Sequence, residues 1–190
     1  MSRWEPDGRG RLEQAALALY GERGFDHTTV AEIAERAGVT ERTFFRHFAD
    51  KREVLFPPEG ARRLQELLVR TVADAPASLA PIDAVAAGLE AAGAPLQERR
   101  ATARQRAAII AANPELRERE LIKLAAWSAA LADTLQRRGL SDAAARLTAE
   151  VAIAVFRIAF DCWIEDTNDR DFPRLVRESL DHLKAFTAGE

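Results

Sequence analysis

The sequence predicts an all-α protein of nine or ten helices, and three observations support this fold class. The 190-residue chain is rich in alanine and arginine, which are good helix formers. Apolar residues recur at intervals of three and four, whereas no segment alternates apolar and polar residues for long enough to form a strand. Glycine, proline and N-capping residues separate the periodic segments. With 47% hydrophobic residues, the chain can bury a substantial core.

The first three predicted helices are short and closely spaced. The first covers about residues 9–23. The second begins at Thr28-Thr29, whose hydroxyls can cap exposed N–H groups, and Gly38 ends it. Thr40 caps the third, which runs to about residue 48. Two short helices joined by a tight turn that contains glycine form a helix-turn-helix.

The remaining helices follow the same kinds of signal. A fourth is expected after Asp50, but Pro57-Pro58 should interrupt it, because proline lacks the N–H group and clashes with the preceding turn. Helical periodicity resumes at about residues 59–73. The later predicted helices cover about residues 82–91, 97–111, 114–138 and 142–165, and the last follows Asp171-Phe172-Pro173 and ends near residue 186. We expect two domains, residues 1–52 and residues 53–190.

Composition and charge narrow the function classes. The formal net charge of -3 argues against indiscriminate binding of nucleic acid by the whole chain. Residues 42–52 nevertheless carry four basic side chains and one acidic side chain. Cys162 is the single cysteine, so no internal disulfide is possible, which fits a reducing compartment. The first six residues lack the apolar stretch of a signal peptide, and no apolar run reaches the roughly 20 residues of a membrane span. We expect a cytoplasmic protein with no membrane partner.

The third predicted helix has one apolar and one polar side. Phe44 and Phe48, four residues apart, should point inward. The residues left for the outer side are Glu41, Arg42, Thr43, Phe45, Arg46 and His47. Arginine pairs with guanine in the major groove, and a ring can contact the thymine methyl group. The predicted DNA-binding set also includes Thr29, Thr40 and Lys51, and Thr40, His47 and Lys51 suit phosphates. The alternative is a solvated helix face.

Six segments between residues 11 and 56 resemble the N-terminal signature of TetR-family regulators. They are Gly24-Phe25-Asp26-His27-Thr28-Thr29-Val30, Ile33-Ala34, Ala37-Gly38-Val39-Thr40, Phe44-Phe45-Arg46-His47-Phe48, Lys51 and Val54-Leu55. The resemblance implies a homodimeric, ligand-responsive repressor that binds a palindromic operator. It places Thr43, Phe45 and His47 on the recognition helix and assigns a phosphate contact to Lys51. The family commonly has tyrosine where this chain has Phe45, so a hydroxyl–phosphate bond would be lost.

The predicted helix over residues 142–165 is apolar on two sides. One stripe is Leu147, Val151, Val155, Ile158 and Cys162, and the other is Ile153, Phe156, Phe160, Trp163 and Ile164. A helix that is apolar nearly all round must be covered on both sides. The family resemblance implies a ligand pocket on one side and a second protomer on the other. The last helix would join that dimer interface through Leu175, Val176, Leu180 and Leu183. A monomeric core is the alternative.

The predicted ligand-binding residues are mostly aromatic. They are Ile110, Trp127, Phe156, Phe160 and Trp163, with Arg106 or Arg157 as a polar anchor. Ligand pockets are mostly apolar with a few placed polar groups, and the C-terminal half resembles regulators with acyl-CoA-like effectors. Two interpretations compete with this one. The aromatic residues can form plain core, and Arg157 can pair with Asp161 four residues later.

Two other function classes are a small helical enzyme and a helical adaptor that binds no DNA. The three histidines, His27, His47 and His182, are scattered along the chain, and Glu178 and His182, four residues apart on the last helix, are more often a surface pair than a metal site. The sequence contains no glycine-rich phosphate loop and no nucleophile motif. We therefore expect no catalytic residues, no metal and no cofactor. DNA binding would separate the regulator from the adaptor.

Overall fold

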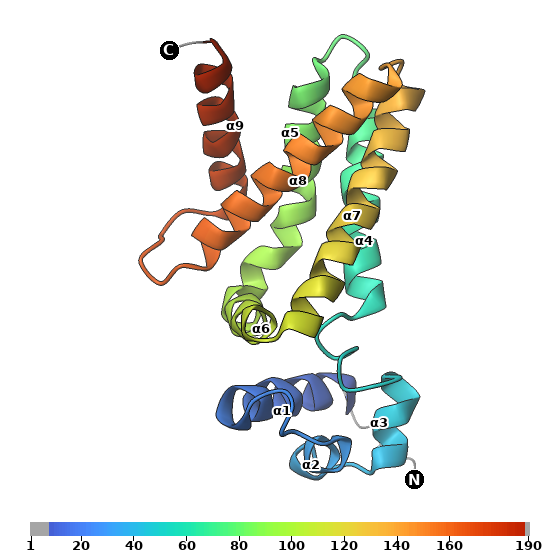
Figure 1. The fold of residues 1–190 in the computed structure, drawn as a ribbon, viewed down its shortest axis with the longest axis vertical. Coiled ribbons are helices and arrows are strands. Elements are labelled where there is room, and N and C mark those ends of the chain that lie inside the picture. Colours follow the sequence, from blue (N-terminus) through green and yellow to red (C-terminus); the bar gives the residue numbers. More distant parts are fainter. Residues whose placement is uncertain (1–7, 189–190) are drawn as a thin grey trace. The chain divides into compact units, whose positions relative to one another are not determined.

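The computed structural model describes residues 8–188, all of whose regular elements are helical (Figure 1). The elements are α1 (Gly8–Arg23), α2 (Val30–Arg36), α3 (Glu41–His47), α4 (Pro58–Asp74), α5 (Pro81–Gly93), the 3-10 helix η1 (Ala94–Arg99), α6 (Arg100–Ala112), α7 (Pro114–Arg137), α8 (Asp142–Ile164) and α9 (Phe172–Ala188). The predicted all-α class is confirmed. The first six residues, on which the absence of a signal peptide was predicted, lie outside the described range.

The chain divides into two compact units. Unit 1 comprises Met1–Ala61 and Gln105–Glu118, and unit 2 comprises Arg62–Arg104 and Arg119–Glu190. The helices α4, α6 and α7 therefore contribute residues to both units. None of the helices within residues 8–188 is long and apolar enough to cross a membrane.

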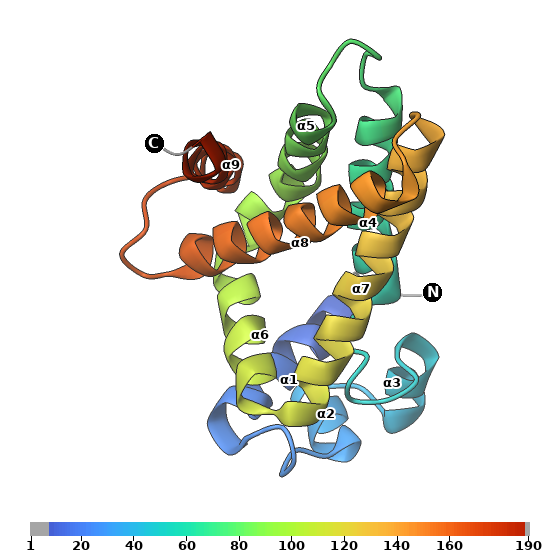
Figure 2. The same ribbon diagram turned by 45° about the horizontal axis from the view of Figure 1, so that its top comes forward.

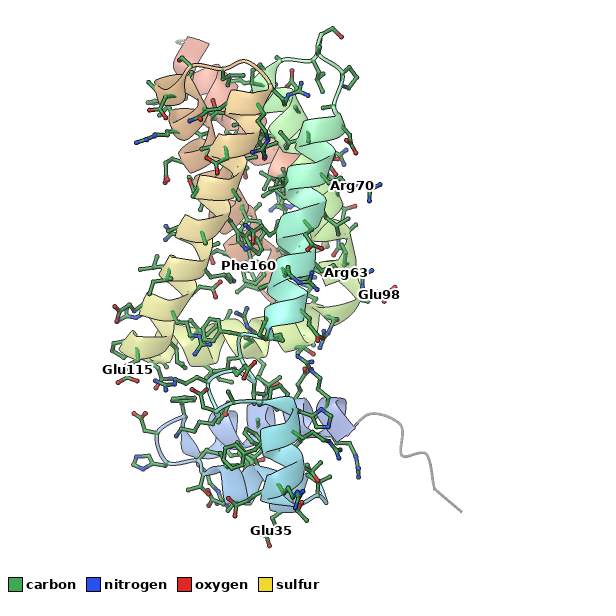
Figure 3. The ribbon with its side chains drawn as sticks, turned by 90° about the vertical axis from the view of Figure 1, so that its right-hand side faces the viewer. Glu35, Arg63, Arg70, Glu98, Glu115 and Phe160 are labelled. Carbon is green, nitrogen blue, oxygen red and sulfur yellow. The ribbon has the colours of Figure 1, made fainter. Side chains whose placement is uncertain are left out.

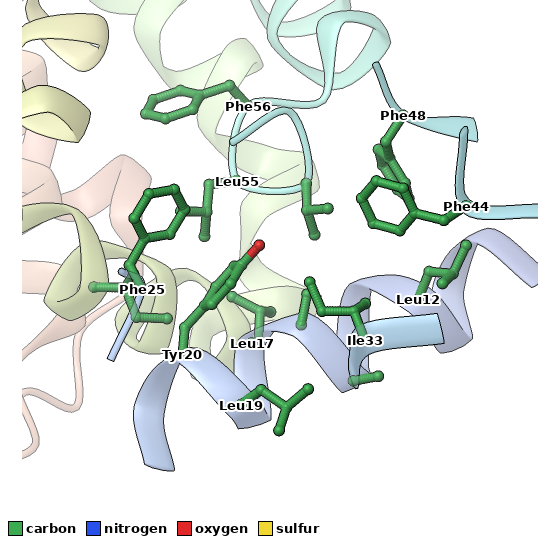
Figure 4. Close-up of a cluster of buried hydrophobic side chains, with 14 of the residues drawn as sticks. Leu12, Leu17, Leu19, Tyr20, Phe25, Ile33, Phe44, Phe48, Leu55 and Phe56 are labelled. Carbon is green, nitrogen blue, oxygen red and sulfur yellow. The ribbon is translucent and has the colours of Figure 1, made fainter. Parts of the chain in front are cut away.

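Unit 1 contains the helix-turn-helix. The side chains of Leu12, Ile33 and Phe44 are fully buried where α1, α2 and α3 meet (Figure 4). Gly38 has a φ of 67° in the turn between α2 and α3, a conformation that costs glycine little because it has no Cβ. Val39 packs against the same core beside it. The helix-turn-helix expected from the Ala37–Thr40 segment is present.

Unit 1 extends beyond the predicted N-terminal domain of residues 1–52. Its core also contains the buried side chains of Leu55, Ile109, Ile110 and Leu116. The later part of α6 and the first turn of α7 therefore complete this core, although they follow α3 by more than fifty residues. A single domain boundary after residue 52 cannot describe unit 1, because this unit is built from two separate segments of the chain.

The segment between α3 and α4 differs from the predicted broken helix. Residues 51–55 form turns, and α4 begins at Pro58. Proline fits the first position of a helix because that position needs no N–H donor. The carboxylate of Asp50 accepts hydrogen bonds from the backbone N–H groups of Arg52 at 2.8 Å and Glu53 at 2.9 Å. These bonds hold the turns that replace the first part of the expected helix.

Unit 2 is a helical bundle in which α5, α8 and α9 pack against one another. In Figure 2, α8 crosses α5 and α9 lies beside both helices. Leu68 and Leu89, from α4 and α5, are almost completely buried. Leu131 and Leu135 of α7 are also fully buried. Arg63 and Arg70 project from α4 and are exposed (Figure 3).

Candidate functional site

The start of α3 is fixed by Thr40. This residue has an extended backbone, and its hydroxyl oxygen accepts a hydrogen bond from the N–H of Thr43 at 3.2 Å. The two threonine hydroxyls are 3.1 Å apart. The first N–H groups of a helix have no acceptor within the helix, so this cap stabilises the first turn of α3.

The start of α2 is fixed by a reciprocal capping box. The hydroxyl oxygen of Thr29 accepts from the N–H of Glu32 at 3.3 Å, and the Glu32 carboxylate accepts from the N–H of Thr29 at 2.9 Å. The backbone hydrogen bond from Thr29 is the main reason why the pKa of Glu32 lies below its ordinary value. The capping box thus fixes where α2 begins, and the turn at Gly38 fixes how α2 leads into α3.

The side chains of α3 divide as predicted between an inner and an outer side. Phe44 and Phe48 are buried, and their ring centroids are 5.4 Å apart. Glu41, Arg42, Phe45 and Arg46 are exposed, whereas Thr43 and His47 are partly buried. Phe45 leaves 55% of its surface exposed beside two arginines. The outer side therefore combines cationic donors with one accessible ring.

The positive charge of this surface rests on Arg42 and Arg46. Within the described part of the chain, no carboxylate forms a salt bridge with either guanidinium. Arg46 Nη2 lies 3.5 Å from His47 Nε2. In contrast, Arg52 pairs with Asp50 at 3.0 Å. Arg42 and Arg46 thus keep their donors available for an external acceptor.

The ammonium group of Lys51 forms hydrogen bonds with backbone carbonyls of the same chain. Its ammonium group donates to the carbonyl oxygens of Phe25 at 2.8 Å, Thr28 at 2.9 Å and Asp26 at 3.4 Å. It also lies 4.4 Å from the centroid of the Phe25 ring. The phosphate contact of Lys51 stays a prediction, and it competes with this internal arrangement.

Four predicted ligand-binding residues do come together in unit 2. Trp127 and Phe156 have ring centroids 5.6 Å apart, and Phe160 lies 6.0 Å from Phe156 and 5.7 Å from Trp163. Phe160 lies among the helices of the bundle (Figure 3). We call these four residues, with Phe172, the aromatic cluster.

Phe172 belongs to the aromatic cluster although the sequence does not indicate it. Its ring lies 5.6 Å from that of Phe156 and 6.0 Å from that of Trp163. The Asp171-Phe172-Pro173 sequence predicts only the start of the last helix. The indole N–H of Trp163 donates to Gln97 Oε1 at 2.9 Å, so the cluster also contains a polar side chain that the sequence does not single out.

The remaining three ligand candidates do not join the cluster. Arg106 and Ile110 belong to unit 1. The guanidinium group of Arg106 donates to the carbonyl of Leu55 and lies 5.1 Å from the centroid of the Phe56 ring. The side chain of Ile110 is part of the hydrophobic core of unit 1. The sequence does not show that α6 contributes residues to both units, so it could not separate these two residues from the aromatic ones. Arg157 is exposed. Burial raises the pKa of Asp161, and the charge of Arg157 opposes that rise.

The last two helices differ in how they present apolar residues. On α8, Leu147 is 67% exposed and Ile158 is 56% exposed, whereas Val155 of the same predicted stripe is buried. On α9, Leu175, Val176 and Leu180 are buried in the chain, where α9 packs on α5 and α8. The predicted placement of these three α9 residues in a dimer interface is therefore wrong, because α5 and α8 already cover that side of α9.

Comparisons with known proteins cover both units. The model described as "Bacterial regulatory proteins, tetR family" matches residues 13–56, and that described as "MftR C-terminal domain" matches residues 79–188. The transcriptional regulator TcmR of Streptomyces glaucescens is 40% identical over 83 residues, which is 44% of this chain and 36% of TcmR. This chain therefore matches about a third of the length of that relative.

Two further similarities extend over most of the chain. The putative mycofactocin biosynthesis transcriptional regulator MftR of Mycobacterium tuberculosis is 27% identical over 160 residues, covering 82% of this chain and 79% of MftR. The structure of FadR from Bacillus subtilis in complex with stearoyl-CoA has a TM-score of 0.62 at 19% identity, covering 92% of this chain and 96% of FadR. The similarity to FadR concerns the fold alone. On the two family matches, the chain belongs to the tetR family of bacterial regulatory proteins, with a C-terminal domain of the MftR type.

Proposed function

We propose that this protein represses transcription by binding a palindromic operator as a homodimer, and that a small apolar or acyl-type effector releases it. The observation that carries the proposal is the division of α3, with Phe44 and Phe48 buried and Arg42, Phe45 and Arg46 exposed. An α-helix fits the major groove, and these outer side chains match what base edges require.

Each outer residue of α3 has a proposed role. Arg42 and Arg46 donate to guanine, Phe45 contacts a thymine methyl group, and Glu41 accepts from a cytosine amino group. Thr43 and His47 flank these contacts. Thr29 and Thr40, directly before α2 and α3, are proposed to contact backbone phosphates.

The exposed apolar side of α8 supports the homodimer. Leu147 and Ile158 lie eleven residues apart, which is close to three helical turns and puts them on one side of the helix. Ala154, between them, is also exposed. We propose that a second protomer packs on this stripe and that the dimer binds two half-sites about one DNA turn apart.

The aromatic cluster of unit 2 is the proposed effector site. It combines large rings of a mostly apolar bundle with the Gln97 amide, and pockets for small molecules use this combination. FadR, which has a similar fold, was solved with stearoyl-CoA. We therefore favour an effector with a long apolar part.

Helix α6, whose residues belong to both units, offers a route for the signal. In unit 2, Arg100 donates to the carbonyls of Glu165 at 2.6 Å and Asn168 at 2.7 Å, just after α8. In unit 1, Gln105 donates to the carbonyl of Leu17 at 3.0 Å, and Arg106 to that of Leu55. We propose that a shift at the end of α8 moves α6, whose later residues belong to the core of unit 1.

The test begins with selection of bound duplexes from a random pool, which should return an inverted repeat. Acyl thioesters of increasing chain length are then titrated into the protein with and without the selected operator. Coupling of about 1–3 kcal/mol would lower operator affinity about 5–150-fold, and operator must weaken the thioester by the same factor. A site without inverted symmetry would oppose the dimer, and equal thioester affinity in both titrations would oppose the switch.

A further inference from the structure

Arg100 lies at the Trp163 end of the aromatic cluster. The indole N–H of Trp163 donates to Gln97, which precedes Arg100 by three residues. Arg100 itself donates through Nη2 to the carbonyl of Asn168 at 2.7 Å, and the side-chain amide of Asn168 donates to the carbonyl of Trp163 at 3.4 Å. Asn168 is only 8% exposed and Trp163 is fully buried. Arg100 is therefore part of the polar layer that covers this end of the cluster.

The segment that leads to Arg100 follows the aromatic cluster. Gly93, directly before η1, is packed against the ring of Phe172 so closely that a Cβ would collide with it. The 3-10 helix η1 also packs on α9, which begins at Phe172. From Gly93 to Arg100 the chain thus passes from the Phe172 side of the cluster to the Trp163 side, and all of these residues belong to unit 2.

The guanidinium group of Arg100 has a donor that the chain does not use. Its Nε atom is buried, and within the described residues this N–H has no hydrogen-bond partner. A buried donor without an acceptor is costly, so each one in a native structure calls for an explanation. No carboxylate within residues 8–188 forms a salt bridge with Arg100, whereas Arg104, one turn later, pairs with Asp166. Arg100 therefore combines an unused N–H with a positive charge that no carboxylate balances.

We propose that Arg100 is the polar anchor of the effector, and that its Nε–H donates to a carboxylate or thioester carbonyl oxygen at the head of an apolar chain. The tail of that chain would lie among the rings of the aromatic cluster. A guanidinium group has only donors, so its partner must supply an acceptor, and a carbonyl-type oxygen does so. The inference rests on the proposed effector site. It gives that site the cationic anchor that neither Arg106 nor Arg157 supplies.

The first experiment needs no effector and compares thermal unfolding of the wild type, Arg100→Lys and Arg104→Lys. Lysine has a methylene group where arginine has Nε, and its ammonium group keeps the charge and can donate to backbone carbonyls. In Arg104 the same change removes the bond from Nε to the Ile164 carbonyl, so Arg104→Lys is the matched control. We expect Arg104→Lys to melt at a lower temperature and Arg100→Lys to melt no lower than the wild type. A loss in Arg100→Lys as large as that in Arg104→Lys would show that its Nε–H is satisfied without an effector and would overturn the proposal.

The second experiment titrates three ligands into the same proteins in a Trp4→Phe background and follows the fluorescence of Trp127 and Trp163. The ligands are dodecanoate, dodecanoyl-CoA and the thioether S-dodecyl-CoA, which lacks only the carbonyl oxygen. We expect Arg100→Lys to lose about tenfold or more in affinity for a ligand that carries the oxygen and little for the thioether, whereas Arg104→Lys keeps the wild-type preference. A loss for dodecanoyl-CoA identifies a thioester head group, and a loss for dodecanoate alone identifies a free carboxylate.

Two results of the titrations would overturn the anchor while leaving the proposed effector site in place. One is an Arg100→Lys variant that binds all three ligands as the wild type does. The other is an equal loss for the thioester and the thioether, because the thioether offers no carbonyl oxygen to Nε. A wild type that binds none of the three ligands would contradict the proposed acyl-type effector, and the anchor with it.

Discussion

Substituting alanine for Gly93 should destabilise unit 2 through the aromatic cluster. An ideal Cβ at Gly93 would lie 2.0 Å from Cδ1 and 2.5 Å from Cε1 of Phe172, whereas carbon atoms in contact lie about 3.5–4.0 Å apart. Phe172 is fully buried, and its ring packs on Phe156 and Trp163, so it cannot retreat by the roughly 1.5 Å that ordinary contact requires without moving the cluster.

The size of the effect follows from two opposing terms. Overpacking of this kind costs about 3 kcal/mol, and alanine at a helical position regains at most about 1 kcal/mol over glycine. We expect a net loss of about 2 kcal/mol, which at an m-value of about 2 kcal/mol/M lowers the urea midpoint by about 1 M.

Tryptophan fluorescence can follow this transition selectively. In a Trp4→Phe background the remaining indoles, Trp127 and Trp163, both belong to unit 2. The control is Phe172→Leu, which shortens the opposing side chain. If the clash is the cause, Gly93→Ala should cost much less in that background than in the parent. A Gly93→Ala midpoint equal to the parent's, or an equal cost in both backgrounds, would refute the reasoning.

Three further predictions concern unit 1. Thr29→Ala should destabilise it by about 1 kcal/mol in thermal unfolding, whereas Thr29→Ser should keep most of the capping box, and equal losses would exclude the cap as the cause. Because hydrogen bonds hold the pKa of Glu32 below its ordinary value of 4.5, the carboxylate stabilises the fold at neutral pH and loses that effect as the pH falls below 4.5 through its folded-state pKa. Glu32→Gln should therefore flatten the decline of the melting temperature at acidic pH, and an unchanged decline would contradict this assignment. Arg106→Met should weaken effector-induced release of the operator more than Arg63→Met, an exposed substitution on α4, and equal release would argue against α6 as the route.

Much of the helix-turn-helix was predictable because its signals are local. Thr29 and Thr40 cap helices that start within one residue of them, and Gly38 takes the positive φ that the turn requires. The four-residue spacing of Phe44 and Phe48 correctly indicated the buried side of α3. Each of these inferences depends on residues no more than about one helical turn apart.

The parts that escaped prediction depend on residues distant in sequence. An apolar pair such as Ile109 and Ile110 shows that α6 is covered, but the sequence cannot tell that the core of unit 1 covers it. The apolar side of α9 raised the same ambiguity, and α5 and α8 of the same chain, not a partner, cover Leu175. Lys51 bonds to residues 23–26 positions earlier, which no local pattern could indicate.

Sequence-specific recognition by α3 is tested most directly by measuring affinity for the selected operator and for a scrambled duplex of the same composition. The variants are Arg46→Ala and Arg63→Ala, which both remove one exposed arginine. We expect Arg46→Ala to lose about 1–3 kcal/mol on the operator, which is about 5–150-fold, with little change on the scrambled duplex. Arg63→Ala should match the wild type on the operator. Equal losses for Arg46→Ala on both duplexes, or a wild type that does not distinguish them, would contradict the account.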